Sequence, residues 1–478
     1  MIWIALAAAV AALLVLLLAR TAAFKPKQVQ KSPPYEVEVD DKKIISDMCE
    51  LIRCKTISYR DKSLIDEAEF DRLRALLPKL YPAVFKTCEM KRVGDTGLLF
   101  KWKGEAESEP TVLMAHYDVV PVNEEQWEKP AFEAIIDENS VLWGRGTLDT
   151  KGTFCGVLES CEQLIKSGFV PKNDIYLSFS GDEEVAGDSA PAIVAELERM
   201  GVRPQLVVDE GGAVVDGVFP GVTQPCALVG IGEKGMLDVE FSVKSSGGHA
   251  SAPPPHTPVG ILSAAAVAVE NHPFKCRITP PAAEMFDTLG RHSTFVFRLI
   301  FANLWLFKPV LDAMTKKSGG ELNALMRTSV AFTQMQGSKA SNVIPPEAKM
   351  VANLRLAGGD TVESAVEDLK NKVGDSRVSV AALHGMNPSV YSDTTSKGWL
   401  DTKAAIEETW PDAIVSPYLM IACSDSRHFC RISDKVMRFS AMPLSKEERG
   451  LIHGNNERIP TAKLVETVKF YIRLIQKR

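Results

Sequence analysis

Hydrophobic and polar positions divide the chain into segments of different type, and the first is an unbroken apolar run. Residues 2–19 are all apolar, and Arg20 ends the run. As a helix this run would span roughly 27 Å, close to the hydrocarbon thickness of a bilayer. Residues 1–24 are therefore predicted to form a single-pass transmembrane anchor. A signal segment that is cleaved for secretion is the alternative, but no basic side chain precedes the run and its cleavage site is weak.

The segment after the run is polar and contains Pro33 and Pro34, so residues 25–42 are predicted to be a linker. Its lysines would hold the folded part of the chain in the cytoplasm. The family resemblance described below favours the opposite side, so the side of the membrane stays open.

From about residue 43 onward, short apolar runs alternate with amphipathic ones. Residues 111–115, 174–179 and 204–208 have the pattern of buried strands, and residues 150–166 and 190–200 that of helices. Strands that alternate with helices of this length predict an α/β fold, a mainly parallel sheet flanked by helices. We expect residues 43–234 and 391–478 to be the two parts of this domain.

The pattern changes after Gly235. Residues 236–243 and 349–356 alternate between apolar and polar positions, as half-exposed strands do, whereas residues 259–269 and 362–373 have helical periodicity. Two helices over an antiparallel sheet are the expected arrangement. We therefore predict an inserted α+β domain over residues 235–390, which would act as a lid or in dimerisation.

Composition narrows the classes of function. The net charge is −6, and the sequence has no cluster of Lys and Arg of the kind that binds phosphates, which argues against nucleic acid as a partner. The nine cysteines are odd in number and contain no C-x-x-C pair. This favours buried cysteines over a disulfide framework or a zinc knuckle.

Acidic and imidazole side chains recur where predicted strands end. In an open α/β sheet, ligands gather outside the carboxyl ends of the strands. A single such residue is more often a helix cap or a solvated charge, but adjacent carboxylates repel unless a cation or a proton intervenes. Imidazole with carboxylate suits zinc, manganese or cobalt. The residues in question are His116, Asp118, Asp149, Glu183, Glu184, Asp209 and His453.

At these positions the sequence resembles the aminoacylase, carboxypeptidase G and carboxypeptidase S family of co-catalytic zinc hydrolases, over roughly residues 43–477. Glu233-Lys-Gly235 and Asn303-Leu-Trp-Leu-Phe307 favour the branch of carboxypeptidase S and N-fatty-acyl-amino-acid hydrolases. The motifs are specific in combination: Met114-Ala-His-Tyr-Asp-Val-Val-Pro121, Gly144-Arg-Gly-Thr-Leu-Asp-Thr-Lys-Gly152, Gly181-Asp-Glu-Glu184, Val208-Asp-Glu-Gly-Gly212, Gly247-Gly-His-Ala-Ser-Ala-Pro253, Asn342-Val-Ile-Pro345 and Ile452-His-Gly454.

The resemblance implies a zinc-peptidase-like fold and two Zn²⁺ per chain, with Mn²⁺ or Co²⁺ as alternatives. It implies that His116 and Glu184 bind one zinc, that Asp209 and His453 bind the other, and that Asp149 bridges both. Asp149 is followed by Thr150, where many relatives carry a second acid.

The resemblance also implies roles around the metals. Asp118 would orient His116, and Glu183 would be the general base. His249 and Asn342 would polarise the scissile carbonyl, with His249 supplied by the partner subunit of a homodimer.

Arg355 and Arg427 would hold the substrate carboxylate. Ala422 and Cys423, shortly before Arg427, stand where a Gly and a Thr are commoner in the family.

The predicted function is therefore zinc-dependent hydrolysis of an amide bond beside a free carboxylate, by a zinc-bridging hydroxide. The substrate would be an N-acyl amino acid, including lipid-like ones, or a short peptide. The segment Phe286–Leu311 is rich in Phe, Leu, Ile and Trp, which fits either ordinary packing or a surface for a lipid-like chain. The alternative function is a catalytically silent, membrane-anchored binding protein that retains a metal site.

Overall fold

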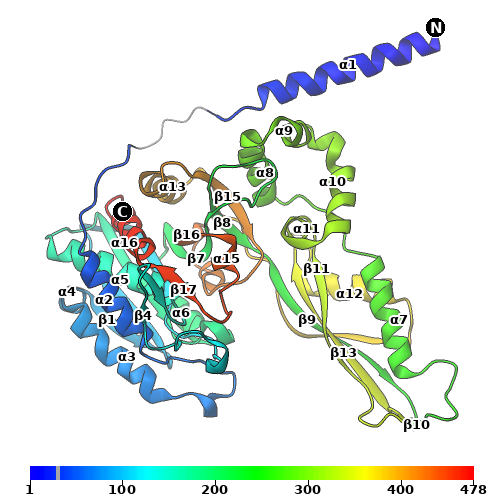
Figure 1. The fold of residues 1–478 in the computed structure, drawn as a ribbon, viewed down its shortest axis with the longest axis horizontal. Helices are drawn as coiled ribbons and strands as arrows, with labels where there is room; N and C mark the ends of the chain where they lie inside the picture. The colour runs from blue at the N-terminus through cyan, green and yellow to red at the C-terminus, as the bar shows by residue number, and fades with distance from the viewer. Residues whose placement is uncertain (28–32) are drawn as a thin grey trace.

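The computed structural model describes residues 1–27 and 33–478; residues 28–32 of the predicted linker lie outside the described residues. The chain begins with α1 (Ile2–Ala23), a helix with a mean hydropathy of 2.9 that is long and apolar enough to cross a membrane. Figure 1 shows α1 projecting away from the folded body at the upper right. This helix has the length of a membrane anchor, and a signal sequence has the same features.

A large mixed sheet forms the centre of the main domain. Its strand order is β1-β2-β6-β3-β7-β16-β8-β15. The neighbours β6, β3, β7 and β16 pair in parallel, as do β8 and β15. The predicted α/β fold with a mainly parallel sheet is confirmed. The strands are β1 (Glu89–Val93), β2 (Gly97–Trp102), β3 (Ala106–His116), β6 (Asn173–Ser180), β7 (Leu206–Val215), β8 (Cys226–Glu233), β15 (Ile414–Met420) and β16 (Val436–Leu444).

The central strands of this sheet are buried on both sides because helices cover both of its faces. Along β3, Leu113 and Ala115 belong to the core beneath α5, whereas Val112 and Met114 belong to the core beneath α6. Successive strand residues point to opposite faces, so an unbroken apolar run serves two cores. The helices are α2 (Asp41–Ile52), α3 (Glu67–Leu80), α4 (Pro82–Thr87), α5 (Lys151–Lys166), α6 (Ser189–Arg199), α13 (Lys397–Thr409), α14 (Ser426–Phe429), α15 (Lys446–Arg449) and α16 (Thr461–Ile475).

A second sheet, with its own apolar core, forms what we call the small domain. Its order is β11-β13-β9-β14, and all its pairs are antiparallel. Buried and half-buried residues alternate along β9 and β13, as the sequence pattern predicts for a sheet covered on one face. The elements are β9 (Gly235–Lys244), α7 (Pro258–Asn271), β11 (Ser329–Gln336), β13 (Glu347–Leu356), α12 (Val362–Val373) and β14 (Ser379–Met386).

Four helices between α7 and β11 form a helical module that the sequence pattern did not predict. Apolar residues of this module, such as Met285, Phe286 and Phe301, join the core of the main domain rather than that of the small domain. Helix α8 packs against β15 at the edge of the large sheet. The helices are α8 (Pro280–His292), α9 (Phe295–Ala302), α10 (Leu304–Ser318) and α11 (Gly320–Met326).

Short elements complete the fold. A three-stranded sheet combines β4 (Ile135–Ile136), β5 (Val141–Trp143) and β17 (Arg458–Pro460), and β10 (Gly248–His249) pairs with β12 (Val343–Ile344). The 3₁₀ helices are η1 (Lys62–Leu64), η2 (Glu124–Gln126) and η3 (Glu183–Val185). Pairing of β5 with β17 brings the C-terminal segment beside the loop that carries Asp149.

Candidate metal centre

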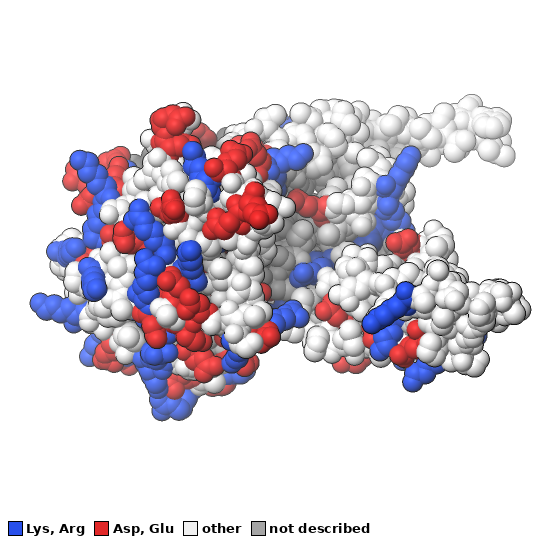
Figure 2. Space-filling view, turned by 60° about the horizontal axis from the view of Figure 1, so that its bottom comes forward, with Lys and Arg blue, Asp and Glu red and all other residues white. Residues whose placement is uncertain are grey.

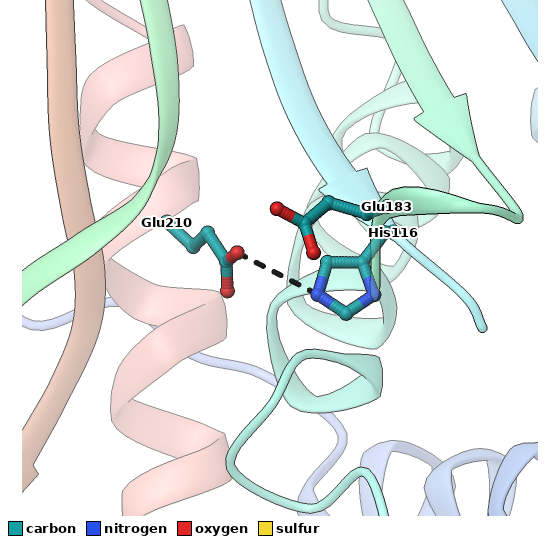
Figure 3. A group of neighbouring side chains, drawn as sticks. All are labelled: His116, Glu183 and Glu210. Atoms are coloured by element: carbon teal, nitrogen blue, oxygen red, sulfur yellow. Dashed lines mark ion pairs between the residues drawn. The ribbon is translucent and has the colours of Figure 1, made fainter. Parts of the chain in front are cut away.

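Three neighbouring strands of the large sheet deliver polar side chains to one edge. His116 is the last residue of β3, Glu183 and Glu184 follow β6 in η3, and Glu210 lies within β7. Because β6, β3 and β7 are adjacent and parallel, their carboxyl ends meet. Figure 3 shows the carboxylate of Glu210 directed at the imidazole of His116, with Glu183 beside the same ring.

The carboxylate of Asp149 lies between two imidazoles. Its Oδ1 is 3.0 Å from Nε2 of His116, and its Oδ2 is 3.0 Å from Nε2 of His453. The same Nε2 of His453 is 3.0 Å from Oε2 of Glu184, and Nε2 of His116 is 3.5 Å from Oε1 of Glu210. Asp149 therefore joins two clusters, each with one imidazole and one further glutamate.

The donor set fits divalent cations. Within residues 1–27 and 33–478, potential ligand atoms lie within 4.8 Å of one another in two groups, His116 with Glu183 and Glu210, and His116 with Asp149 and Glu184. The buried Oε1 of Glu184 has no hydrogen-bond partner there, although buried carboxylate oxygens normally have one. Carboxylate and imidazole without thiolate suit zinc and neighbouring divalent metals. The side chains thus form a candidate metal centre.

The electrostatics of the cluster show an excess of buried negative charge. Burial raises the pKa of Glu210 to about 8, with the nearby Asp149 adding to the effect, and burial raises the pKa of Glu183 well above its usual value. Hydrogen bonds to Asp149 and Glu184 raise the pKa of His453 to about 10. Burial alone lowers the pKa of His116, but Glu210 and the hydrogen bonds to Asp118 and Asp149 outweigh it and raise that pKa. A bound cation would remove this competition for protons.

The structure differs from the predicted ligand set within β7. Asp209 belongs to neither group of potential ligands, and its Oδ2 accepts a hydrogen bond of 2.9 Å from the backbone N–H of Ser426. In the structure the carboxylate of the next residue, Glu210, faces His116, whereas the carboxylate of Asp209 faces the N–H of Ser426. Both stand in the Val208-Asp-Glu-Gly-Gly212 motif, which was the only signal for Glu210 in the sequence.

The pairing of ligands differs as well. The resemblance implied that Glu184 pairs with His116 and Asp209 with His453, whereas in the structure His453 contacts Glu184 and His116 contacts Glu210. Asp149 lies between the two imidazoles, as expected for a bridge.

Asp118 connects the imidazole of His116 to the turn that carries the two glutamates. Its Oδ1 lies 3.3 Å from Nδ1 of His116. Its carboxylate also accepts hydrogen bonds of 3.2 Å from the backbone N–H groups of Glu183 and Glu184, and one of 2.7 Å from the hydroxyl of Ser58. The buried carboxylate of Asp118 thus fixes both the orientation of the His116 imidazole and the position of η3.

Two of the predicted residues lie far from this cluster within the chain. His249 is exposed in β10, and the backbone carbonyl of Asn342 accepts a hydrogen bond of 2.9 Å from the N–H of Ala250. Figure 1 places β10 at the lower right end of the small domain, remote from the large sheet. The structure therefore brings His249 and Asn342 next to each other but not to the metal centre of their own chain.

The two predicted carboxylate-binding arginines belong to different domains, and both lie at residues 423–427. Nη1 of Arg355, on β13, is 3.4 Å from Sγ of Cys423, and Nη2 of Arg427 donates to the carbonyl of Asn387 at 2.9 Å. Nη1 of Arg427 is buried without a hydrogen-bond partner among the described residues. This Nη1 lies 3.8 Å from Oε2 of Glu233, and residues 423–427 connect the small domain to the main domain.

Known proteins resemble this chain along most of its length. The model of "Peptidase family M20/M25/M40" matches residues 112–477. N-fatty-acyl-amino acid synthase/hydrolase PM20D1 of Xenopus tropicalis is 36% identical over 92% of this chain and 86% of its own length. Probable carboxypeptidase S-like 2 of Dictyostelium discoideum is 34% identical over 88% of this chain and 82% of its own length.

Solved structures share the fold at low sequence identity. The metallo-carboxypeptidase Sso-CP2 of Sulfolobus solfataricus has a TM-score of 0.66 at 16% identity, over 91% of this chain and 98% of that one. Human carnosine dipeptidase 1 has a TM-score of 0.63 at 14% identity, over 91% and 96%. The predicted resemblance is confirmed: the chain belongs to peptidase family M20/M25/M40 and is an amidohydrolase.

Proposed function

We propose that the centre binds two divalent cations, with zinc as the preferred metal. One would lie among His116, Glu210 and Asp149, and the other among His453, Glu184 and Asp149. The observation that carries the proposal is the carboxylate of Asp149, which presents one oxygen to each imidazole at 3.0 Å. This replaces Asp209 by Glu210 in the ligand set suggested by sequence, because Asp209 is held by the N–H of Ser426. A solved relative in fold, the YXEP protein of Bacillus subtilis, is described as a dinuclear metal binding peptidase.

We assign proton transfer to Glu183. When bound, the cations would supply Lewis-acid activation of water and of the scissile carbonyl. Glu183 lies beside His116 and Glu210, and its pKa is raised by burial. A carboxyl group with a raised pKa can accept the proton of water and later return it to the leaving amine. The product of the reaction would be a free amine and a free acid.

The proposed substrate is an N-acyl amino acid or a short peptide with a free carboxylate. Nη1 of Arg427 is buried and donates no hydrogen bond among the described residues, although it lies 3.8 Å from Oε2 of Glu233, and Arg355 lies at the same loop. Arginine binds carboxylates through paired, charge-assisted hydrogen bonds. The relatives' names cover both alternatives, since one set is called N-fatty-acyl-amino acid synthase/hydrolase and the other carboxypeptidase S-like. The intact base and ligand positions favour an active enzyme over a silent binding protein.

We further propose that the active form is a homodimer in which His249 and Asn342 complete the site of the partner subunit. In their own chain both residues lie at the far end of the small domain. His249 is exposed, and its Nδ1 accepts a hydrogen bond of 3.1 Å from the N–H of Ser251. That bond would leave Nε2 available to donate to a developing oxyanion.

We also propose that α1 is retained as a membrane anchor. Thr21 and Arg20, at the end of α1, contact the fold, although Ala22 and Ala23 are themselves exposed. Thr21 is fully buried, and Arg20 donates to the side chain of Asn303 at 3.1 Å. Cleavage near Ala22 would remove these contacts from Asn303, which is itself fully buried. Retention is checked by the intact mass of the protein from the membrane fraction, and loss of residues 1–23 would contradict it.

Replacing Glu183 with Gln tests the chemistry. The variant should keep close to two cations per chain, measured by mass spectrometry of the metal content, because the proposed ligands are unchanged. Its kcat should fall by roughly 10²–10⁴-fold, since an amide cannot accept the proton. Glu125→Gln, an exposed position, is the control and should behave as wild type. Activity above roughly a tenth of wild type would remove Glu183 from this role.

Replacing Glu457 with Ala tests the support of the bridging carboxylate. Glu457 is fully buried and accepts hydrogen bonds from Arg145 at 2.6 Å and from the N–H groups of Leu148 and Asp149 at 2.7 and 3.2 Å. The variant leaves the buried guanidinium of Arg145 without its carboxylate partner, and loss of one partner of a buried ion pair costs about 3–5 kcal/mol. Metal affinity should fall roughly 10–100-fold, measured by competition with a chromogenic chelator.

The matched control for Glu457 is Glu447→Ala. Glu447 pairs with Arg458 at 2.8 Å, but its side chain is 74% exposed. Exposed pairs contribute at most about 1 kcal/mol, so neither thermal stability nor metal affinity should change. Equal metal affinity in a folded Glu457→Ala protein and in this control would contradict the support role.

Mixing two inactive variants tests whether His249 acts in the partner subunit. His249→Ala and Glu183→Gln each disable one part of the site. In a mixed dimer, the chain that carries His249→Ala keeps its own Glu183 and receives the intact His249 of the other variant, so one site is complete. Random exchange of subunits should restore roughly a quarter of wild-type activity. No recovery, although mass spectrometry detects mixed dimers, would place His249 outside the partner's site.

Removing the substrate carboxylate tests the recognition step. An N-oleoyl amino acid, an N-acetyl amino acid and a dipeptide are each compared with the matching C-terminal amide. The amides should lose roughly 10–100-fold in kcat/KM, because hydrogen bonds to a charged group contribute about 1.5–3 kcal/mol. Arg427→Ala should lower activity on the acids and leave activity on the amides unchanged. Equal rates for acid and amide would contradict recognition of the carboxylate, and a strong preference for acetyl would exclude a lipid-like acyl group.

A further inference from the structure

The helical module exposes an apolar surface on α9 and α10, which we call the apolar platform. It consists of Phe295, Val296, Trp305, Leu306, Val310 and Met314, all more than a third exposed. At 3.6 residues per turn, the four members on α10 lie within one half of the helix surface. The other half holds the buried side chains of Leu311 and Thr315. One side of α10 therefore packs on the protein, whereas the other presents large apolar side chains outward.

Basic residues accompany this surface. Lys308, Lys316 and Lys317 are exposed on α10, and the one acid of that helix, Asp312, is already paired with Lys316 and Arg327. Figure 2 shows an almost uncharged surface running from α1 onto the adjoining part of the body, whereas charged side chains crowd the main domain. An apolar helix face with exposed lysines is typical of helices that lie in the interface of an anionic bilayer.

The end of α1 is fixed to this module by specific contacts. Nδ2 of Asn303 lies 3.4 Å from the carbonyl of Leu17 and 3.3 Å from Oγ1 of Thr21, and Arg20 donates to the carbonyl of Ala302 at 3.1 Å. These residues of the module form the junction between α9 and α10.

A second contact lies one turn further along the chain. The guanidinium of Arg291, on α8, lies over the ring of Phe24 at 4.4 Å and donates to the carbonyl of Lys25 at 3.1 Å. The helix is thus docked at its exit from the apolar run, and not only connected through the linker.

We propose that the apolar platform is a second membrane contact, which inserts into the interface of the bilayer that α1 spans. The proposal rests on the retention of α1. Because α1 leaves the body at the junction of α9 and α10, the platform lies where the bilayer surface would meet the protein. Trp305 suits the headgroup region, where Trp is enriched, and the lysines suit anionic lipid. Continuity with the apolar α1 favours lipid over a second protein as the occupant.

An environment-sensitive fluorophore on single introduced cysteines tests this contact in the full-length protein. Val310→Cys reports the platform. Val390→Cys is the matched control, because the two valines are 53% and 55% exposed. Leu14→Cys reports α1. Each protein is placed in vesicles of phosphatidylcholine and phosphatidylserine, with and without brominated acyl chains, and the signal of labelled parent protein is subtracted to account for Cys423 and Cys430, which are only partly buried.

The expected result is a blue-shifted emission at positions 310 and 14 that brominated lipid quenches, and an unshifted, unquenched emission at position 390. A water-like signal at 310 with a quenched signal at 14 would overturn the platform while α1 still spans the bilayer. Emission at 310 that is blue-shifted but not quenched would mean that a second copy of the chain covers the surface, which also overturns it. Absence of quenching at both 14 and 310 would overturn the anchor and the platform together.

Discussion

The concentration of carboxylates at one buried edge of the sheet is the constraint on which the rest of the site depends. Two charges 4 Å apart interact by about 4 kcal/mol at an effective dielectric constant of 20, so Asp149, Glu184 and Glu210 cannot all be ionised there without positive charge. In the structure, His116 and His453 supply part of it through contacts of 3.0–3.5 Å. The geometry holds only if the segments carrying these groups are fixed against mutual repulsion.

Three further buried carboxylates provide that fixation, and each one holds a different segment. Asp118 accepts the backbone N–H groups of η3, and Glu457 accepts those of the loop before α5. Glu233 accepts hydrogen bonds from the hydroxyls of Ser424 and Ser426, both at 3.1 Å, and forms a buried ion pair with Arg438. Each of these carboxylates is saturated by hydrogen bonds from the segment that it holds, so the three supports fix the positions of η3, of the loop before α5 and of residues 424–426.

The sequence predicted the α/β fold and most of the residues that the structure gathers, because both depend on local patterns. The end of β3 at His116 follows from an apolar run that stops at a polar residue. The sequence does not predict whether Asp209 or Glu210 faces His116. Both residues follow the same apolar run, and only the directions of their side chains distinguish them. The pairing of His453 with Glu184 depends on how the C-terminal segment meets β5, a long-range contact that leaves no mark in either segment.

The pattern of apolar residues also does not predict which side of the helical module is buried. Its apolar residues are distributed around α9 and α10, because one side of the module packs into the main core while the other is exposed. Hydrophobicity alone does not separate these two sides. Packing against β15 and docking of α1 together define them, and both involve residues distant in sequence.

Packed elements, and not only the linker, connect the proposed anchor to the main domain that carries the metal centre. Arg20 and Asn303 join α1 to α9, and α8 of the same module packs on β15 of the large sheet. Residues after the undescribed segment are bound too, since Arg473 of α16 donates to the carbonyl of Tyr35 at 2.6 Å. The contacts of α1 with Asn303 and of Lys25 with Arg291 give the anchor a defined orientation on the helical module, which a single flexible tether would not give. The proposed anchor would therefore hold the main domain, and with it the metal centre, at a defined angle to the bilayer.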